Sequence, residues 1–527
     1  MIRSPFNFVP LSEKVFFPDW ADNISHDVPF ADGVSGTIDI DITACSPIFI
    51  RNGHTRTDHA AENEEYKSFS YIKGADGRKC YYIPATSIKG EVRNLLEIMS
   101  FSKMSVDRRA MFARRDLHDK PNYPLLGNQN SIRCGWLRRS GEAYTISDCG
   151  TPMRISLEEI DNYVGDDVLT SKFMDSGNFD LNKEVRVGDN LYMDPKSAAY
   201  KYHLLKDVPL KGLRFSEIKK STIGQSILRY DSEGSIKGTI VMTGQPSPRK
   251  VNPKGKGEGK FYEFVFPEEE KGNYAVSEEM FNHFSFIYKD SSEWKRIDKL
   301  LNDDDAVPVF FRIEKGEVKD FGMAYMYKLP YERSVFDALP ESHQSEDLDL
   351  AQCIFGFVDN DHKRYNSLKG RVQFGNAFAV HAEEDNDVEL ILGGPKASYL
   401  PIYIRQDGKN GTLSGDYATY DKGTPSGWKR YHVRDGVWQK TATETTDTKF
   451  RPLKQGALFR GTVSFHNLRP VELGALLAAL TFFNTPECFH QLGMAKPYGY
   501  GRCRYDVRLH AVALADVFSE KPSELRE

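Results

Sequence analysis

Two segments with alternating apolar and polar residues mark the two ends of a predicted core. Between residues 36 and 50, isoleucines alternate with polar side chains in the order Ile38, Asp39, Ile40, Asp41, Ile42 and Thr43. Residues 458–465 alternate in the same way. A period of two is typical of a strand that buries one face and exposes the other. We therefore predict strands here, and further strands over residues 235–243, 261–266, 307–313 and 502–509.

Four segments show the spacing of a helix. Within residues 89–99, apolar side chains recur at i, i+3, i+4 and i+7, namely Val92, Leu95, Leu96 and Met99. Residues 470–482 contain a similar stripe of leucines. Residues 277–288 and 106–117 are also predicted to be helical. Such stripes are typical of helices that pack one face against a core, so the whole pattern indicates an α+β fold.

The start of the first predicted helix carries candidate phosphate-binding groups. An apolar run ends at Pro84, which favours an extended residue before it. Thr86 and Ser87 are good N-cap residues. Backbone N–H groups at a helix start are unpaired and partly positive, and Lys89 and Arg93 follow closely. This arrangement suits a phosphate, although an ordinary capped helix with two surface cations would show the same residues.

A glycine-rich stretch late in the chain offers a second group of this kind. Residues 492–505 read Leu-Gly-Met-Ala-Lys-Pro-Tyr-Gly-Tyr-Gly-Arg-Cys-Arg-Tyr. Its glycines permit a tight loop and a close approach of the backbone to a ligand, and they are Gly493, Gly499 and Gly501. The same stretch supplies cations and stacking faces, which are Lys496, Tyr498, Tyr500 and Arg502.

Together, the two stretches resemble the RAMP superfamily, the RNA-binding proteins of CRISPR systems. In that family an Ile-Pro-x-Ser-Ser-x-Lys-Gly-x-x-Arg motif opens a helix, and a glycine-rich loop comes late in the chain. Here Ala85, Thr86 and Ser87 stand where the family usually has Gly-Ser-Ser. Residues 353–356 (Cys-Ile-Phe-Gly) and 369–374 (Lys-Gly-Arg-Val-Gln-Phe) resemble the family's Leu-Phe-Gly and Gly-Arg-Val-x-Phe stretches.

The resemblance implies a ferredoxin-like (RRM-like) core with an antiparallel sheet. It covers residues 36–135 and 351–510, whereas the segment between them departs from a minimal RAMP domain. That segment is predicted to be a large mixed α/β insertion, similar to those of large RAMP proteins of type III CRISPR loci. The expected parts are the first part of the core (1–141), the insertion (142–350), the second part of the core (351–515) and a C-terminal tail (516–527).

The polar linker between the first strand and the first helix holds the candidate catalytic residues. In the family, this linker carries an aspartate that cuts bound target RNA in those backbone subunits that have the activity. Asp58 is the positional match and Asp76 the second choice. His54 and His59 are candidates for proton transfer near neutral pH. Such cleavage commonly needs a divalent ion such as Mg²⁺, but the sequence shows no cluster of metal-ligating residues. The alternative is that this linker is a solvated loop without a catalytic role.

Further cations extend the candidate RNA-binding set. Residues 103–139 are rich in arginine, and Arg108, Arg109 and Arg115 stand beside apolar and aromatic residues. That mixture suits a phosphate track, while a solvated helix face balanced by nearby aspartates is the alternative. Arg371, in the second part of the core, is expected to face a phosphate or an acidic partner.

Composition narrows the setting of the protein. A chain of 527 residues is too long for one typical core. Its formal net charge of −5 argues against a uniformly basic nucleic-acid coat but not against a local basic groove. Seven scattered cysteines without a Cys-x-x-Cys motif favour reduced thiols in a cytoplasm. No apolar run reaches membrane-spanning length, so no membrane partner is expected.

Three functions fit these features. The first is an RNA-binding subunit of a type III CRISPR ribonucleoprotein, which holds guide RNA and target RNA beside other type III subunits and cleaves the target at one position. In this function base pairing reads the sequence and the protein holds the backbone. The second is an endoribonuclease that processes the guide precursor, and the third is a non-catalytic structural adaptor of the complex.

Overall fold

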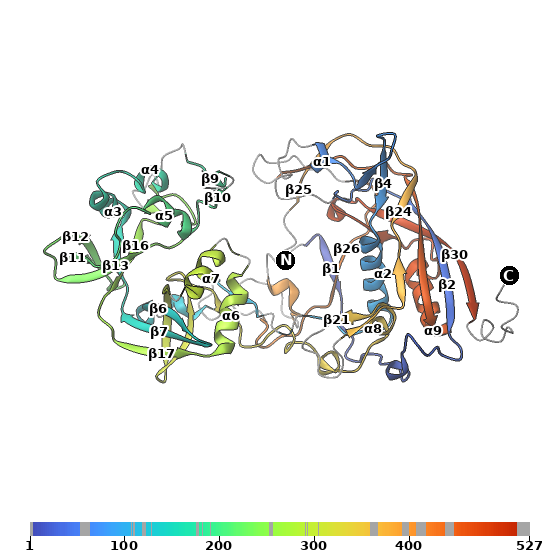
Figure 1. The fold of residues 1–527 in the computed structure, drawn as a ribbon, viewed down its shortest axis with the longest axis horizontal. Helices are drawn as coiled ribbons and strands as arrows, with labels where there is room; N and C mark the ends of the chain where they lie inside the picture. Colours follow the sequence, from blue (N-terminus) through green and yellow to red (C-terminus); the bar gives the residue numbers. More distant parts are fainter. Residues whose placement is uncertain are drawn as a thin grey trace. The chain divides into compact units, whose positions relative to one another are not determined.

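The chain forms an α+β structure in which most strand pairs are antiparallel (Figure 1). The computed structural model describes residues 4–52, 64–106, 108, 111–117, 123–127, 129–174, 179–181, 183–189, 191–251, 257–289, 291, 293–303, 305–358, 367–392, 400–406, 418–437 and 447–513. The chain divides into two compact units. Unit 1 comprises Met1–Val106, Asp337–Thr412 and Ala418–Glu527, and unit 2 comprises Asp107–Phe336 and Leu413–Tyr417.

Unit 1 is built on a sheet whose neighbouring strands come from distant parts of the sequence. The strand order is β29-β30-β2-β28-β24-β4-β3, and β23 also pairs with β28. Every pairing in this sheet is antiparallel. The strands are β2 (Val34–Ala44), β3 (Tyr71–Lys73), β4 (Lys79–Ile83), β23 (Val372–Phe374), β24 (Ala377–His381), β28 (Leu458–Leu468), β29 (His490–Gln491) and β30 (Arg502–Ala513).

Strand β2 lies inside this sheet, between β30 and β28, and confirms the alternating pattern. Ile38, Ile40 and Ile42 have no exposed surface, because they face the hydrophobic core of unit 1. Asp41, on the opposite face, forms an ion pair with Arg460 of β28 at 2.7 Å. One face of the sheet is therefore apolar and covered, and the other is polar and partly exposed.

Helices α2 (Ala85–Met99) and α9 (Pro470–Thr481) pack against the apolar face of the sheet (Figure 1). Both predicted leucine-rich stripes are confirmed, because they belong to one buried cluster with the isoleucines of β2. Unit 1 also contains the short helices α1 (Glu64–Lys67) and α8 (Leu350–Phe355). The described part of unit 1 also includes three small strand pairs, namely β1 (Phe6–Val9) with β26 (Trp428–Tyr431), β25 (Val388–Ile391) with β27 (Asp447–Phe450), and β21 (Phe357–Val358) with β22 (Ser367–Leu368).

The start of α2 differs from the prediction. The N-cap residue is Pro84, without a side-chain cap, so the expectation that Thr86 and Ser87 would cap the helix is wrong. The proline ring fixes φ near the helical value, which lets the helix begin at the next residue. Thr86 and Ser87 therefore lie in the first turn of α2.

Unit 2 combines a small closed barrel with a five-stranded sheet. The barrel contains β8 (Met153–Ser156), β11 (Leu213–Lys220), β12 (Ser226–Tyr230), β13 (Ile236–Val241) and β16 (Tyr262–Pro267). The sheet contains β6 (Arg133–Ser140), β7 (Ala143–Gly150), β17 (Gly272–Val276), β18 (Val307–Glu314) and β19 (Glu317–Gly322). The predicted strands near residues 235, 261 and 307 are thereby confirmed. The helices of this unit are α3 (Leu157–Val164), α4 (Thr170–Phe173), α5 (Ala198–Leu204), α6 (Glu278–Tyr288) and α7 (Trp294–Asn302).

A buried charge cluster lies within unit 2. The carboxylate of Glu263, on β16, has no exposed surface and accepts hydrogen bonds from both Lys201 and Lys260. The backbone N–H of Thr243 donates to the same carboxylate at 2.8 Å. Two cations therefore share one anion inside this unit, so Glu263 holds both lysines in place.

The predicted helix over residues 106–117 is wrong. Within the described part of this segment, Ala113–Arg114 forms strand β5, which pairs with β20 (Leu329–Pro330). Tyr331 donates its N–H to the carbonyl of Phe112, and the Arg114 guanidinium lies 5.1 Å from the centre of the Tyr331 ring. Tertiary pairing with a segment far along the chain has overridden the local helical spacing.

The predicted boundary at residue 142 falls in the turn between β6 and β7, which pair with each other inside unit 2. The division of the chain into a core and an insertion stays a prediction. Among the described residues, no helix is long and apolar enough to cross a membrane.

Candidate functional site

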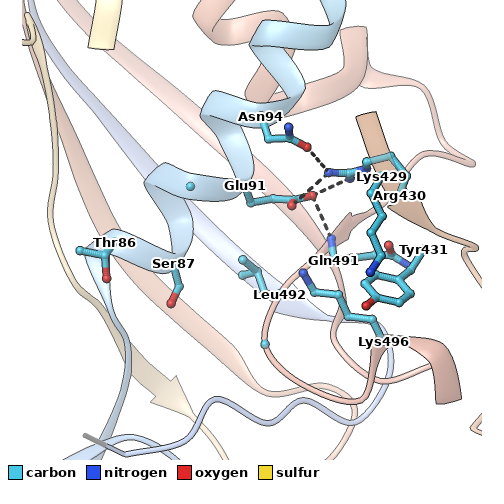
Figure 2. A pocket seen from close by; sticks show the side chains of 12 residues that line it. Thr86, Ser87, Glu91, Asn94, Lys429, Arg430, Tyr431, Gln491, Leu492 and Lys496 are labelled. Carbon is cyan, nitrogen blue, oxygen red and sulfur yellow. Dashed lines mark hydrogen bonds and ion pairs between the residues drawn. The ribbon is translucent and has the colours of Figure 1, made fainter. Parts of the chain in front are cut away.

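A pocket of about 430 Å³ joins the two stretches that the sequence singled out. It lies in unit 1 between the first turns of α2, strand β26 and the loop that follows β29 (Figure 2). The lining residues are Thr86, Ser87, Gly90, Glu91, Asn94, Lys429, Arg430, Tyr431, Gln491, Leu492, Gly493 and Lys496. The helix start and the glycine-rich loop, more than 390 positions apart, thus meet at one site.

The glycine-rich loop reaches this position because its glycines allow a tight path. Gly493 has φ 80°, and a Cβ atom there would lie 2.1 Å from the carbonyl oxygen of Phe49. Gly501 has φ 76°, and its Cβ would lie 1.9 Å from the carbonyl oxygen of Leu492. No other residue type fits either position without moving the backbone. The loop is therefore held against the sheet, with Lys496 at the pocket.

An ion pair attaches strand β26 to helix α2 at the pocket wall. Arg430 donates to Glu91 at 2.8 Å and to the side chain of Asn94 at 3.0 Å (Figure 2). The backbone N–H of Gln491 also donates to Glu91, at 3.3 Å. Burial alone would raise the pKa of Glu91, but the Arg430 guanidinium outweighs it and the net pKa lies below its usual value. Glu91 is thus a fixed anion already engaged by its neighbours.

The remaining charge of the pocket is positive. Its lining contains three cationic side chains and one carboxylate, and Glu91 is already paired with Arg430. Burial lowers the pKa of Lys496, and the attraction of Glu91 offsets part of that shift. Within the described residues, the Lys496 ammonium has no hydrogen bond or ion pair (Figure 2). An anion in the pocket would therefore find a cation that no hydrogen bond or ion pair of the described residues engages.

The structure separates the predicted cations of α2 from this pocket. Ser87, Gly90, Glu91 and Asn94 follow the i, i+3, i+4, i+7 spacing of one helix face, and all four line the pocket. Lys89 and Arg93 lie on a different face.

Arg93 is engaged by groups away from the pocket: it pairs with Glu97 at 2.8 Å and donates to the carbonyl of Gly356 at 3.0 Å. Burial, and then the nearby Arg93, lowers the pKa of Lys89. Of the candidate RNA-binding residues predicted on α2, the structure therefore brings Thr86 and Ser87, but not Lys89 and Arg93, to the glycine-rich loop.

The other predicted residues of the glycine-rich loop support the fold around the pocket. Tyr500 is buried and its ring packs 5.7 Å from that of Phe450. The hydroxyl of Tyr498 donates to the carbonyl of Ile391 at 3.1 Å. Arg502 pairs with Asp435 at 2.9 Å. None of these three side chains lines the pocket.

Several predicted site residues lie elsewhere. Arg371 has no exposed side-chain surface, because it is ion-paired with Glu472 inside unit 1. In unit 2, the Arg108 guanidinium lies 4.7 Å from the centre of the Phe336 ring, and Arg115 is exposed. Arg109 lies outside the described residues.

The candidate catalytic set is largely outside the described part of the chain. Asp58, His54 and His59 all lie outside it. Asp76 lies in the turn between β3 and β4, where its carboxylate accepts the N–H of Arg78 at 3.0 Å. Where the structure describes the chain, no three histidine, cysteine or acidic side chains gather as metal ligands.

Residues 41–307, just over half of the chain, match the family model of the RAMP superfamily. The chain belongs to the RAMP superfamily. The matched segment includes β4 and α2, so the resemblance seen at the start of α2 is confirmed. This RAMP protein is also similar to the crystal structure of Thermofilum pendens Csc2, with 10% sequence identity, 98% of this chain and 78% of that chain covered, and a TM-score of 0.26. No curated protein matches its sequence.

Proposed function

We propose that this RAMP protein is an RNA-binding subunit of a CRISPR ribonucleoprotein, and that the pocket between α2 and the glycine-rich loop holds an RNA phosphate. One observation carries the proposal: the Lys496 ammonium lines a positively charged pocket and has no hydrogen bond or ion pair among the described residues. A phosphate is the anion that such a site in an RNA-binding family would meet.

The helix start favours the same ligand. The first turn of α2 faces the pocket through Thr86 and Ser87, and the partial positive charge of a helix N-terminus attracts anions. The two hydroxyls and the Lys496 ammonium are donors of the kind that phosphate oxygens accept. Contacts of this kind bind the backbone without reading sequence.

We further propose that the complex is a type III effector, in which this subunit holds guide RNA and target RNA and touches other type III subunits. Base pairing would then supply specificity. A ferredoxin-like core is proposed for unit 1, because α2 follows β2, α9 follows β28, and the strand order β30-β2-β28-β24 is the one such a core requires. Target cleavage at one position with Mg²⁺ is proposed for Asp58, with Asp76 as the second choice, and His54 and His59 would assist proton transfer.

Two alternatives follow from the same family. A guide-precursor endoribonuclease would cut precursor RNA without a target, and a structural adaptor would bind neither RNA through this pocket. Mixing the purified protein with precursor RNA and with a guide–target duplex distinguishes these functions. The endoribonuclease would cut the precursor RNA, whereas the adaptor would neither cut nor bind either RNA.

The test of the pocket is RNA affinity measured over a range of salt concentrations. Lys496→Ala should weaken binding to every RNA sequence and reduce the slope of log affinity against log salt by about 0.7, the value for one phosphate contact on a single strand. Lys454→Ala is the matched control, because Lys454 is 51% exposed and paired with Glu383 in the same unit. Unchanged affinity and slope for Lys496→Ala would show that the pocket does not bind an RNA phosphate.

A further variant asks whether the RNA path extends around the helix. Lys89→Ala removes the half-buried cation on the neighbouring face of α2 without breaking a described ion pair. A lower salt slope would assign Lys89 a second phosphate, as the family motif implies, whereas an unchanged slope would confine the contact to the pocket.

A further inference from the structure

The two-stranded ribbon of β1 and β26 has two chemically different faces. Directly opposed residues of an antiparallel pair project to the same side. Phe6 opposes Tyr431, and Phe8 opposes Lys429, so these four side chains share one face. Arg430 projects to the other side, where it pairs with Glu91 of α2. One face therefore attaches the ribbon to α2, and the other is turned away from it.

The outer face of the ribbon forms an aromatic cluster, defined here as Phe6, Phe8, Tyr403 and Tyr431. The Phe6 and Phe8 rings lie 5.8 and 5.4 Å from that of Tyr403. The Phe6 ring lies 6.1 Å from that of Tyr431. Lys429 adds a cation, because its ammonium lies 4.0 Å from the centre of the Phe6 ring and donates to the Tyr403 hydroxyl at 3.3 Å.

These rings keep part of their surface in solvent. All four members of the aromatic cluster are only half-buried, whereas Phe450 and Phe459 in the core of unit 1 have no exposed surface. The aromatic cluster also adjoins the phosphate pocket, since Lys429 and Tyr431 line that pocket. A ligand that leaves the pocket past β26 therefore meets aromatic rings beside a cation.

We infer that the aromatic cluster stacks an unpaired RNA base while the adjoining pocket holds a phosphate of the same strand. The inference rests on the proposed function and assigns the form of RNA at this site. Aromatic rings beside cations are the general means of binding single strands, because every base has a face to stack and each phosphate needs a positive partner. Bases inside a duplex are already stacked and paired, so the ligand here is single-stranded RNA.

The test uses the full-length protein and a single-stranded RNA that carries 2-aminopurine, whose fluorescence falls when the base stacks. The variant Phe6→Leu/Tyr403→Leu keeps apolar volume but removes two stacking faces. We expect it to lose the fluorescence quenching and to bind the strand about tenfold more weakly than the parent. Phe6→Trp should retain both the quenching and the affinity, because it keeps an aromatic ring at this position.

Two controls separate stacking from folding and from phosphate binding. Phe16→Leu changes a ring that is 44% exposed and lies at the far end of α2, where the backbone N–H of Phe16 donates to the carbonyl of Phe101. It should quench and bind as the parent does, and all variants should melt within a few degrees of one another. Equal quenching and affinity for Phe6→Leu/Tyr403→Leu and the parent would overturn the inference. If Lys496→Ala still weakened binding in that case, the proposed function would stand without it.

Discussion

The buried ion pair between Arg371 and Glu472 allows a prediction that distinguishes a structural cation from an RNA ligand. Both side chains have no exposed surface. Arg371 donates to the carboxylate of Glu472 and also to the carbonyl oxygens of Cys353, at 3.1 Å, and Asn467. Arg371→Met keeps an unbranched side chain in this space and removes all of these donors.

The expected cost follows from what the substitution leaves behind. Among the described residues, Glu472 would then keep as donors the N–H of Arg469 at 2.9 Å and the indole N–H of Trp20 at 3.3 Å. A buried carboxylate that loses its cation costs about 3–5 kcal/mol of unfolding free energy. Changing Glu472 to Gln as well removes the unpaired charge and keeps an acceptor for the Arg469 N–H. The double variant should therefore be about 2 kcal/mol more stable than Arg371→Met alone.

Urea unfolding of the parent, both single variants and the double variant measures these differences. RNA affinity of the folded Arg371→Met protein, measured against salt, should keep the slope of the parent, because the guanidinium does not reach solvent. The burial argument would be refuted if Arg371→Met unfolded at the same urea concentration as the parent and if its slope of log affinity against log salt fell by the value of one phosphate contact. Arg371 would then be the phosphate ligand that its place in the family motif suggests.

Three further outcomes are expected. Burial lowers the pKa of His490 to about 4, so between about pH 6.5 and 4 the unfolded chain binds one proton more than the folded chain. The free energy of unfolding should therefore fall by about 3 kcal/mol as the pH is lowered through this window. Urea midpoints measured against pH should show this fall, and His490→Gln should make it smaller. Glu263→Gln leaves Lys201 and Lys260 without their shared anion, so the unfolding free energy of unit 2 should fall by about 3–5 kcal/mol. This loss should appear as a thermal transition at lower temperature, whereas the Asp76→Ala control should melt at the temperature of the parent. Asp58→Ala should abolish a fixed cut in target RNA with Mg²⁺ present and leave RNA affinity unchanged, with Asp76→Ala as control; persistence of every cut would make the protein a scaffold at this linker.

The local pattern of apolar and polar residues correctly predicted those elements whose own sequence shows which side chains are buried. Strand β2 and helix α2 were readable because one face of each is apolar over several pleats or turns, and α9 because its sequence is apolar almost throughout. The strand at Ala113–Arg114 could not be predicted in this way, because two residues are too few to show a periodic pattern. It forms by pairing with Leu329–Pro330, which lies far along the chain.

The candidate site shows the same limit. Ser87 and Lys496 were each named as candidate RNA-binding residues, in two separate stretches, and the pocket brings them together. The third wall, β26, was missed because Arg430 meets Glu91 across 339 positions of sequence. The i, i+3, i+4, i+7 spacing of Ser87, Gly90, Glu91 and Asn94 was present in the sequence and would have pointed away from Lys89 and Arg93.

The arrangement of strands around β2 has a consequence for how the chain acquires its structure during synthesis. Both neighbours of β2 come from the last part of the chain, and Asp39 meets Thr462 across 423 positions. At translation rates of roughly 5–20 residues per second, β2 waits on the order of 20–80 s for its partners. Most of unit 2 is continuous, Asp107–Phe336, and emerges before them. An apolar strand with two open edges is meanwhile exposed to other chains, so nascent or C-terminally truncated protein should depend on chaperones far more than the finished molecule does.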